Sequence, residues 1–367
     1  MKKVFVYACL NDNLGDDLFI DILCNRYPNI QFITVCERDG KKRKANFPRN
    51  FKILYKTFLV DLVNKCSWKL WKKNIYEYVL GKFCKAIVYI GGSIFMEPQE
   101  RKEAVIEYRN SFFVKNIPFF VIGANFGPYD TQDYIGEMNR YFDKCEDVCF
   151  RDRYSQKFFG EKNNVRYAPD VVFLNQYKVS DDKDRKIGIS LIQVENKNFL
   201  RDYAKDYYLF IKKIIVEAVK CGYEIALLSF CEVAGDKLAC QKVYDMLPEN
   251  IRDRVEIYNY DGDYLSYLEK LGKLYAMIAT RFHSMILGVK MKISTGVLSY
   301  DCKINQVIND LEQKILFLNI SDISKIEPAT FLQLLLSGKI TVNVEALTEH
   351  AEKQFEVLDK YLNVLDR

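Results

Sequence analysis

The sequence predicts an α/β protein made of two Rossmann-like domains that face each other across a cleft. Strand and helix patterns alternate in both halves of the chain, which indicates parallel βαβ units. The predicted strands are short apolar runs, as in buried parallel sheets. The 367 residues are also too many for one ordinary core. Ligands of such sheets bind beyond the carboxyl ends of the strands.

The composition is that of a globular protein, with 49% apolar and 28% charged residues. The net charge of +5 and the lack of a basic motif argue against a nucleic-acid partner. The 11 cysteines are scattered and show no CxxC pair, which predicts reduced thiols and no metal site. The N-terminus does not resemble a signal peptide, and no apolar run is long enough to cross a membrane. We therefore expect a cytoplasmic protein.

The chain opens with a predicted strand over Val4 to Cys9, a loop, and a helix that includes Leu18 to Leu23. The loop contains Asn13, Gly15 and Asp16. Gly15 permits a tight turn, and Asp16 is predicted to cap the helix. An alternative to a binding role is that Asp16 only caps the helix and complements its dipole. One glycine is not a dinucleotide-binding fingerprint.

A second strand is predicted over Gln31 to Cys36, and Phe58 to Lys82 forms a long amphipathic stretch. Trp68 and Trp71 lie close to several lysines in this stretch. Such a pattern indicates a helix that contacts a membrane surface or an amphiphilic acceptor. The commoner alternative is a surface helix whose apolar stripe faces the core.

Two further strands end in loops that contain glycine. The strand over Ala86 to Ile90 runs into Gly91, Gly92 and Ser93. The strand over Pro118 to Ile122 runs into a loop that contains Asn125. Glycines let a ligand approach the backbone closely. Together with the first loop, these strand ends predict the floor of a cleft.

Arginines follow the next predicted strand, Asp147 to Phe150, as Arg151 and Arg153. A short strand then begins at Val165. The polar stretch from Asn175 to Lys186 is the best candidate for a linker. We therefore place an N-terminal domain at residues 1–178.

The second half repeats the alternation and predicts a C-terminal domain at residues 187–310 and a helical segment at 311–367. Its predicted strands are Ile187 to Leu191, Glu224 to Phe230, Val255 to Tyr258, Leu274 to Ala279 and, last, Lys292 to Leu298. Its predicted helices are Phe199 to Lys220, Asp236 to Leu247, Tyr264 to Leu271, Ile304 to Leu311 and Ala346 to Leu365.

Arg281, His283 and Ser284 stand where the strand ending at Ala279 gives way to a helix. An arginine and a histidine at such an edge provide an anion clamp and a proton carrier. The plainer alternative is that Arg281 pairs with a nearby acid and His283 caps the helix. The chain has only one other histidine, His350, in the predicted C-terminal helix.

A series of short motifs, in this order, resembles the polysaccharide pyruvyl transferase family. The motifs are Asn13-Leu14-Gly15-Asp16-Asp17, Gly91-Gly92-Ser93, Gly123-Ala124-Asn125-Phe126-Gly127-Pro128, Phe150-Arg151-Asp152 with Ser155, Ala168-Pro169-Asp170, Arg281-Phe282-His283-Ser284, and Ser299-Tyr300-Asp301 with Lys303. The resemblance implies a fold similar to GT-B glycosyltransferases. It also implies transfer of the enolpyruvyl group of phosphoenolpyruvate to a sugar as a cyclic ketal, with release of phosphate.

The resemblance further implies roles for individual residues. His283 would give and later take a proton, with a pKa near neutrality. Arginine suits both anionic groups of phosphoenolpyruvate. The implied substrate-binding residues are Arg281, Arg151, Arg153, Lys303, Asn13, Gly15, Asp16, Gly91, Gly92, Ser93, Asn125, Ser284 and Tyr300. Phosphoenolpyruvate is the donor, and no cofactor or metal is expected.

The implied acceptor is a saccharide or a lipid-linked oligosaccharide of a cell-surface or exopolysaccharide precursor. Contact of residues 58–82 with the membrane would place the protein at its inner face. Two other functions remain open at this point. One is a glycosyltransferase that uses a sugar nucleotide, and the other is a saccharide-binding relative that has lost catalysis.

Overall fold

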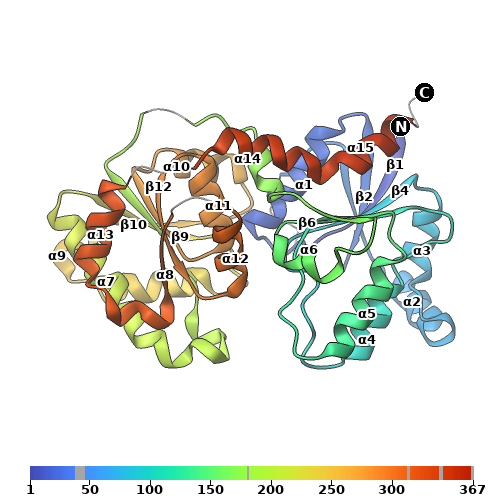
Figure 1. Ribbon diagram of the computed structural model, residues 1–367, viewed down its shortest axis with the longest axis horizontal. Coiled ribbons are helices and arrows are strands. Elements are labelled where there is room, and N and C mark those ends of the chain that lie inside the picture. Colours follow the sequence, from blue (N-terminus) through green and yellow to red (C-terminus); the bar gives the residue numbers. More distant parts are fainter. Residues whose placement is uncertain (38–45, 180–181, 312–314, 339–341, 365–367) are drawn as a thin grey trace.

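The computed structural model describes residues 1–37, 46–179, 182–311, 315–338 and 342–364. It consists of two lobes, each built on one parallel sheet with helices around it (Figure 1). The predicted fold class is therefore confirmed. The predicted linker at 175–186 joins the two sheets, although residues 180–181 lie outside the described part of the chain.

The first lobe holds a seven-stranded sheet in the order β3-β2-β1-β4-β5-β6-β7. Its strands are β1 (Lys2–Tyr7), β2 (Ile30–Cys36), β3 (Phe51–Tyr55), β4 (Ala86–Ile90), β5 (Phe119–Ala124), β6 (Asp147–Phe150) and β7 (Val165–Tyr167). Its helices are α1 (Leu14–Arg26), α2 (Phe58–Trp71), α3 (Ile75–Lys82), α4 (Lys102–Asn110), α5 (Gln132–Phe142), α6 (Arg153–Phe159) and the short η1 (Val171–Leu174).

The second lobe holds a six-stranded sheet in the order β10-β9-β8-β11-β12-β13. Its strands are β8 (Lys186–Ser190), β9 (Glu224–Ser229), β10 (Val255–Asn259), β11 (Ala276–Ala279), β12 (Ser294–Ser299) and β13 (Leu316–Asn319). Its helices are η2 (Val194–Asn196), η3 (Asn198–Tyr203), α7 (Ala204–Lys220), α8 (Asp236–Asp245), α9 (Glu249–Arg252), α10 (Tyr264–Gly272), α11 (Phe282–Lys290), α12 (Cys302–Asp310), η4 (Ile320–Lys325) and α13 (Pro328–Ser337).

Both sheets reverse their strand order at one point, between β1 and β4 in the first lobe and between β8 and β11 in the second. This is the doubly wound order, and the crevice at such a switch point is where ligands of these folds bind. The loops that follow β1 and β4 carry Asn13 to Asp16 and Gly91 to Ser93. The loop that follows β11 carries Arg281. The strand order thus brings the predicted motifs to both switch points.

The sequence analysis predicted neither the strands β3 and β13 nor the helices α4 and α9, and the predicted helical segment from residue 311 contains the strand β13 as well as the helix α13. β3 and β13 are the outermost strands of their sheets and are only partly buried. Both strands contain apolar residues, FKILY in β3 and LFLN in β13, but these runs are short and stand at sheet edges, where a long buried run is not required. The predicted last strand at Lys292 to Leu298 is therefore not the last of its sheet.

The helix α2 is inverted relative to an ordinary surface helix, because its polar face is buried and its apolar face is exposed. Its buried residues are the polar Asn64 and Ser67. Asn64 donates a hydrogen bond to Glu77 of α3 at 2.8 Å and accepts one from the backbone of Tyr76 at 3.1 Å. The apolar side chains of α2 point outward, and Phe58 is 80% exposed. The alternative of a core-facing apolar stripe does not hold.

The C-terminal segment returns to the first lobe (Figure 1). It consists of α14 (Val344–Ala351), η5 (Glu352–Phe355) and α15 (Glu356–Val364), where the sequence predicted one helix. The buried Gln354 side chain accepts a hydrogen bond from Gly123 N at 2.9 Å and donates to the carbonyls of Ala168 and Pro169 at 2.7 and 3.1 Å. One amide group therefore ties the end of the chain to β5 and to the loop after β7.

We expect Gln354→Ala to lower the free energy of unfolding by about 2–4 kcal/mol, because each buried polar group left without a partner costs about 1–3 kcal/mol. The measurement is denaturant unfolding of the variant and the unchanged protein. Glu349→Ala, at an exposed position of α14, is the control and should change stability by less than about 0.5 kcal/mol. Equal effects of the two substitutions would contradict the role of Gln354.

Candidate active site

The N-terminal part of α1 lies where the two lobes meet. Asn13 caps this helix by accepting a hydrogen bond from Gly15 N at 3.0 Å. The prediction that Asp16 is the cap is therefore wrong, since Asp16 lies in the first turn. Asn13 is the better cap because its side chain stands before the helix and can reach back to the free N–H groups.

The same end of α1 contacts the second lobe directly. Leu14 N donates to the carbonyl of Phe230 at 3.1 Å, and Asn13 forms a bridge with Cys231. Farther along the helix, Tyr260 donates to Asp17 at 2.6 Å. Apolar residues of α1, α10 and α11 belong to one continuous core. These contacts close the floor of the cleft and hold the two lobes together.

Arg151, at the end of β6, joins the two walls of the cleft. The side chain is 3% exposed and donates to Asp170 at 3.0 Å and to Asn125 at 2.8 Å, both in the first lobe. Its guanidinium also lies 3.8 Å from the ring centroid of Phe282, and its Nη1 lies 3.4 Å from Nε2 of His283. Because Arg151 can only donate, the resting imidazole presents an unprotonated Nε2 to it.

Two of the predicted glycines leave the space that these side chains occupy. A Cβ atom at Gly15 would lie 1.8 Å from Nδ1 of His283. A Cβ atom at Gly92 would lie 2.5 Å from Nη1 of Arg151. Both positions need glycine because a side chain of another lobe or strand fills the site of the missing Cβ. The glycine loops thus receive protein side chains, which the sequence did not indicate.

His283, in the first turn of α11, is 13% exposed and lies edge-on to Phe19. The pKa of its imidazole is lowered to about 4, mainly by burial; Asp170 opposes this shift, and Arg151 and Arg281 add to it. The expectation of a pKa near neutrality is therefore wrong for the unliganded protein. At neutral pH His283 is uncharged and can accept a proton.

Asp16 shows the opposite shift. The pKa of its carboxyl is raised to about 7, mainly by burial; Arg151 opposes this shift, and Asp170 adds to it. The site thus places a carboxyl that holds a proton near neutrality in the same cleft as an imidazole that does not. Titratable groups with pKa values pushed apart in this way are typical of acid–base catalysis.

Arg281 pairs with the fully buried Asp236 of α8, as the plainer alternative proposed. Its Nε lies 2.9 and 3.0 Å from the two carboxylate oxygens of Asp236, and Nη2 also contacts that group. Asp236 raises the pKa of Arg281, which therefore keeps its charge although burial opposes it. The other part of that alternative does not hold, because Arg281 rather than His283 occupies the cap position of α11.

Two lysines complete the positive wall of the second lobe. Lys303 is 14% exposed and reaches across the cleft to Ser93 at 3.1 Å. Lys197, in the loop after β8, lies 5.0 Å from the ring centroid of Tyr300. Burial lowers the pKa of both ammonium groups; Asp301 opposes this shift, and neighbouring positive charges add to it. An anion bound between them would relieve that repulsion.

Two predicted residues, Gly91 and Ser284, lie near the charged residues of the site but add no functional side chain to it. Gly91 has a φ of 152°, which suits only glycine. Ser284 is fully buried, and its hydroxyl donates to the Arg281 carbonyl at 2.6 Å and lies 2.7 Å from that of Ser190. It therefore shapes the backbone below the site.

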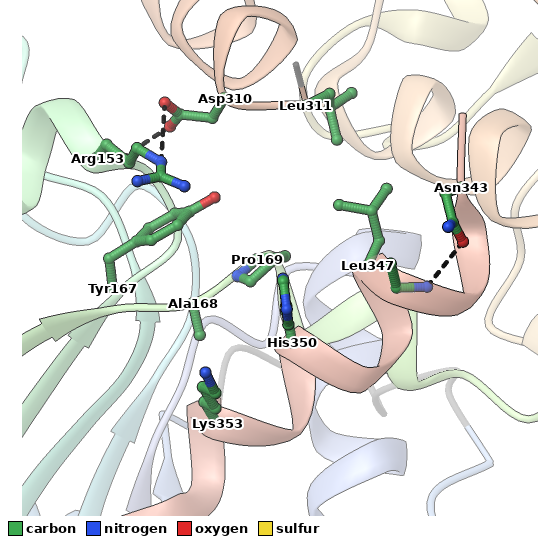
Figure 2. A pocket seen from close by; sticks show the side chains of 11 residues that line it. Arg153, Tyr167, Ala168, Pro169, Asp310, Leu311, Asn343, Leu347, His350 and Lys353 are labelled. Atoms are coloured by element: carbon green, nitrogen blue, oxygen red, sulfur yellow. Dashed lines mark hydrogen bonds and ion pairs between the residues drawn. The ribbon is translucent and has the colours of Figure 1, made fainter. Parts of the chain in front are cut away.

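Arg153 points away from the cluster. It lies against Tyr167, with its backbone N bound to Asp310 at 2.8 Å. Arg153 and Asp310 line a separate pocket, which has a volume of about 300 Å³. Figure 2 shows His350 and Lys353 on the opposite side of this pocket. The structure thus brings together Arg151, His283, Arg281, Lys303, Tyr300, Asn13, Gly15, Asp16, Gly92, Ser93 and Asn125.

Three residues of the site were not predicted. Asp170 and Asp236 hold the two arginines, and Lys197 adds a positive charge. Asp170 stands in one of the recognised motifs, and Asp236 starts a predicted helix, so a search for acids near strand ends could have found both. Lys197 has no such signal. Among the described residues, no three His, Cys, Asp or Glu side chains gather as a metal site would require.

The chain matches known proteins in both sequence and fold. Residues 13–301 match the family model of polysaccharide pyruvyl transferase. The UDP-GlcNAc 2-epimerase of Methanocaldococcus jannaschii has a similar structure, with a TM-score of 0.60, 13% identity and coverage of 98% of this chain and 100% of that one. A mutant of S. aureus TarM, solved with fondaparinux, alpha-GlcNAc-glycerol and UDP, gives 0.57, 11% and full coverage of both chains.

A third similar structure is Medicago truncatula UGT71G1 complexed with UDP-glucose, with a TM-score of 0.53, 10% identity and coverage of 98% of each chain. At these identities the likeness concerns the fold alone, and it places the two lobes with the GT-B glycosyltransferases.

The electrostatics of the site predict the titration of His283. The chain has two histidines, so ring signals in NMR spectra can be assigned with one substitution. The signal that disappears in His283→Gln should titrate with a pKa of about 4, because burial disfavours the charged ring. The ring should thus stay neutral until the pH falls towards 4. A value at or above 6.5 would contradict the described environment.

Proposed function

The chain belongs to the polysaccharide pyruvyl transferase family and is a transferase enzyme, and we propose that it moves the enolpyruvyl group of phosphoenolpyruvate onto a saccharide as a cyclic ketal and releases phosphate. The observation that supports this proposal is a group of four cations: Arg151 and Arg281 lie near His283, Lys303 lies near Arg151, and Lys197 lies near Arg281. The donor itself supplies the transferred group, so the reaction needs no resident cofactor or metal.

Phosphoenolpyruvate carries a carboxylate and a phosphate, and the cleft offers cations from both lobes. Arg151 is the cation of the first lobe, and Lys303 crosses from the second lobe to the Ser93 side of the cleft. An arginine fork can bind a carboxylate or a phosphate through two parallel hydrogen bonds. Arg281 contributes a fixed charge through its pair with Asp236 and helps to hold the Tyr300 phenol. We assign the donor to this space between the lobes.

His283 acts first as a base in the proposed reaction. Its ring is neutral near pH 7, and its unprotonated Nε2 faces Arg151, from which it must turn to a substrate hydroxyl. A hydroxyl of the acceptor that attacks the central carbon of the donor must lose its proton, and His283 takes it. The protonated ring later gives that proton to the departing phosphate. The acceptor approaches from the side of the first lobe.

The test is phosphate release from phosphoenolpyruvate in the presence of glycan acceptors. His283→Ala should slow release by about 10²–10⁴-fold, because a positioned acid–base group contributes that much. His350→Ala removes the other, exposed histidine and should leave the rate unchanged. Retained turnover in His283→Ala would remove His283 from the mechanism.

A glycosyltransferase that uses a sugar nucleotide is the alternative, since proteins of similar fold have been solved in complex with UDP or UDP-glucose. Thermal-shift measurements separate the two functions. Phosphoenolpyruvate should raise the melting temperature, whereas UDP and GDP should not. Stabilisation by a nucleotide and not by phosphoenolpyruvate would favour the alternative.

We further propose that the acceptor is linked to lipid and that the protein works at the cytoplasmic face of the membrane. The inverted α2 supports this proposal. Phe58, Leu59, Leu62 and Val63 recur at helical spacing on the outer face and are each at least 50% exposed. Lysines flank this apolar face, and such a surface suits an anionic bilayer interface. None of the described helices is both long and apolar enough to cross a bilayer.

Vesicle co-sedimentation tests this surface. Leu59→Ser with Leu62→Ser should weaken binding to vesicles that contain anionic lipid by at least about tenfold, because burying each leucine contributes about 1.5–3 kcal/mol. Leu238→Ser, which replaces an equally exposed leucine of the second lobe, should not change binding. Both variants should stay folded because the residues are on the surface. Unchanged binding by the double variant would refute the surface.

A further inference from the structure

Ketal formation needs a proton donor that a neutral His283 does not supply. The methylene carbon of phosphoenolpyruvate must gain a proton as the central carbon is attacked, while the attacking hydroxyl loses one. A neutral imidazole can take up a proton, but it is too weak an acid to protonate a carbon atom. The proposed reaction, on which this inference rests, therefore calls for a second titratable group in the cleft.

Asp16 is placed to be that group. It follows Gly15, whose Cα packs directly against the His283 ring. The charges of Arg151 and Asp170 act on the carboxyl of Asp16. The charge of Asp16 in turn raises the pKa of Cys9 in the first lobe and of Cys231 in the second. Asp16 is partly buried in the first turn of α1, next to the contact of Gly15 with His283, so its carboxyl lies where the two lobes meet.

The other two acids of α1 have structural partners. Asp17 accepts a hydrogen bond from Tyr260 at 2.6 Å, and Asp21 accepts one from Tyr264 at 2.7 Å. In the part of the chain that the structure describes, no side chain or backbone group donates a hydrogen bond to the Asp16 carboxyl. Asp17 and Asp21 therefore bind α1 to the second lobe, whereas the carboxyl of Asp16 can bind a ligand.

We propose that Asp16 is a second catalytic residue, which protonates the methylene carbon of phosphoenolpyruvate while His283 accepts the proton of the attacking hydroxyl. The C–O bond to the acceptor and a new C–H bond form, and the double bond is lost. Asp16 becomes a carboxylate and His283 an imidazolium.

The second half of the reaction restores both groups. A second hydroxyl of the acceptor forms the other C–O bond as the bond from carbon to the phosphate oxygen breaks. Its proton passes to the Asp16 carboxylate, and the imidazolium gives its proton to the leaving phosphate. Each group has then gained and lost one proton, and the site returns to its starting state.

The order of the two pKa values agrees with these roles. Asp16 holds its proton to about pH 7, whereas His283 gives up its proton above about pH 4. The negative charge of the donor would raise both pKa values, so their order is kept when the donor binds. The carboxyl therefore remains the proton donor of the pair.

The experiment compares phosphate release and donor binding in Asp16→Asn, Asp16→Glu and the unchanged protein. Asp16→Asn should lower kcat by about 10²–10⁴-fold. It should bind phosphoenolpyruvate at least as tightly, since it removes a negative charge beside an anion. Asp16→Glu keeps a carboxyl and should restore part of the rate. Asp12→Asn is the control, because asparagine also adopts the positive φ of that position, and its turnover should be unchanged.

The pH dependence gives an independent readout. The rate of the unchanged protein should fall as the pH rises through the pKa of Asp16, because only the protonated carboxyl can donate. The residual rate of Asp16→Asn should lack that fall. Asp170 and Arg151 also act on Asp16, and they are unchanged in all variants.

The outcomes separate this inference from the proposed function. If the unchanged protein releases phosphate and Asp16→Asn keeps its kcat within about twofold, the role of Asp16 is overturned and the pyruvyl transfer stands. An equal loss of donor binding and rate would mark Asp16 as a binding residue and would also overturn the inference. If the unchanged protein neither binds phosphoenolpyruvate nor releases phosphate, both proposals fall.

Discussion

The pairing of the buried Arg151 guanidinium is the interaction on which the rest of the site depends. A buried charge is tolerated only when it is paired and hydrogen-bonded, and Arg151 meets this need with Asp170 and Asn125 of its own lobe. The remaining faces of the group meet Phe282 and His283 of the other lobe. Removing Asp170 would leave a charge without compensation between the lobes. The position of the imidazole thus follows from the pairing of one arginine.

The central part of the fold could be predicted from the sequence, because strands buried on both faces must be apolar along their whole length. Neither β3 nor β13 has that requirement, since each stands at a sheet edge and is partly exposed. The orientation of α2 could not be predicted from the sequence for another reason. Helical spacing shows that one face is apolar, but it does not show whether that face meets the core or the solvent.

The site was predictable to the extent that it lies at strand ends. Topology alone carries Arg151, Arg281 and the glycine loops to the same edge. The charge states were not predictable, because they depend on neighbours that are distant in the chain. Asp236, 45 residues before Arg281, decides that Arg281 is paired, and burial against the first lobe decides that His283 is neutral. Lys197 approaches Tyr300 only through the folding of the second lobe.

The hydrogen bond from Leu14 N to the Phe230 carbonyl also bears on how substrates enter. It joins main-chain atoms of the two lobes at the cleft floor and is supported there by the Asn13 bridge. The opposite rim is joined by the contact of Lys303 with Ser93, which is exposed to water. A flexible lysine releases such a contact more readily than a buried main-chain bond breaks. Domain motion should therefore be a rotation about α1 as its hinge, with the rim of Lys303 and Ser93 opening first.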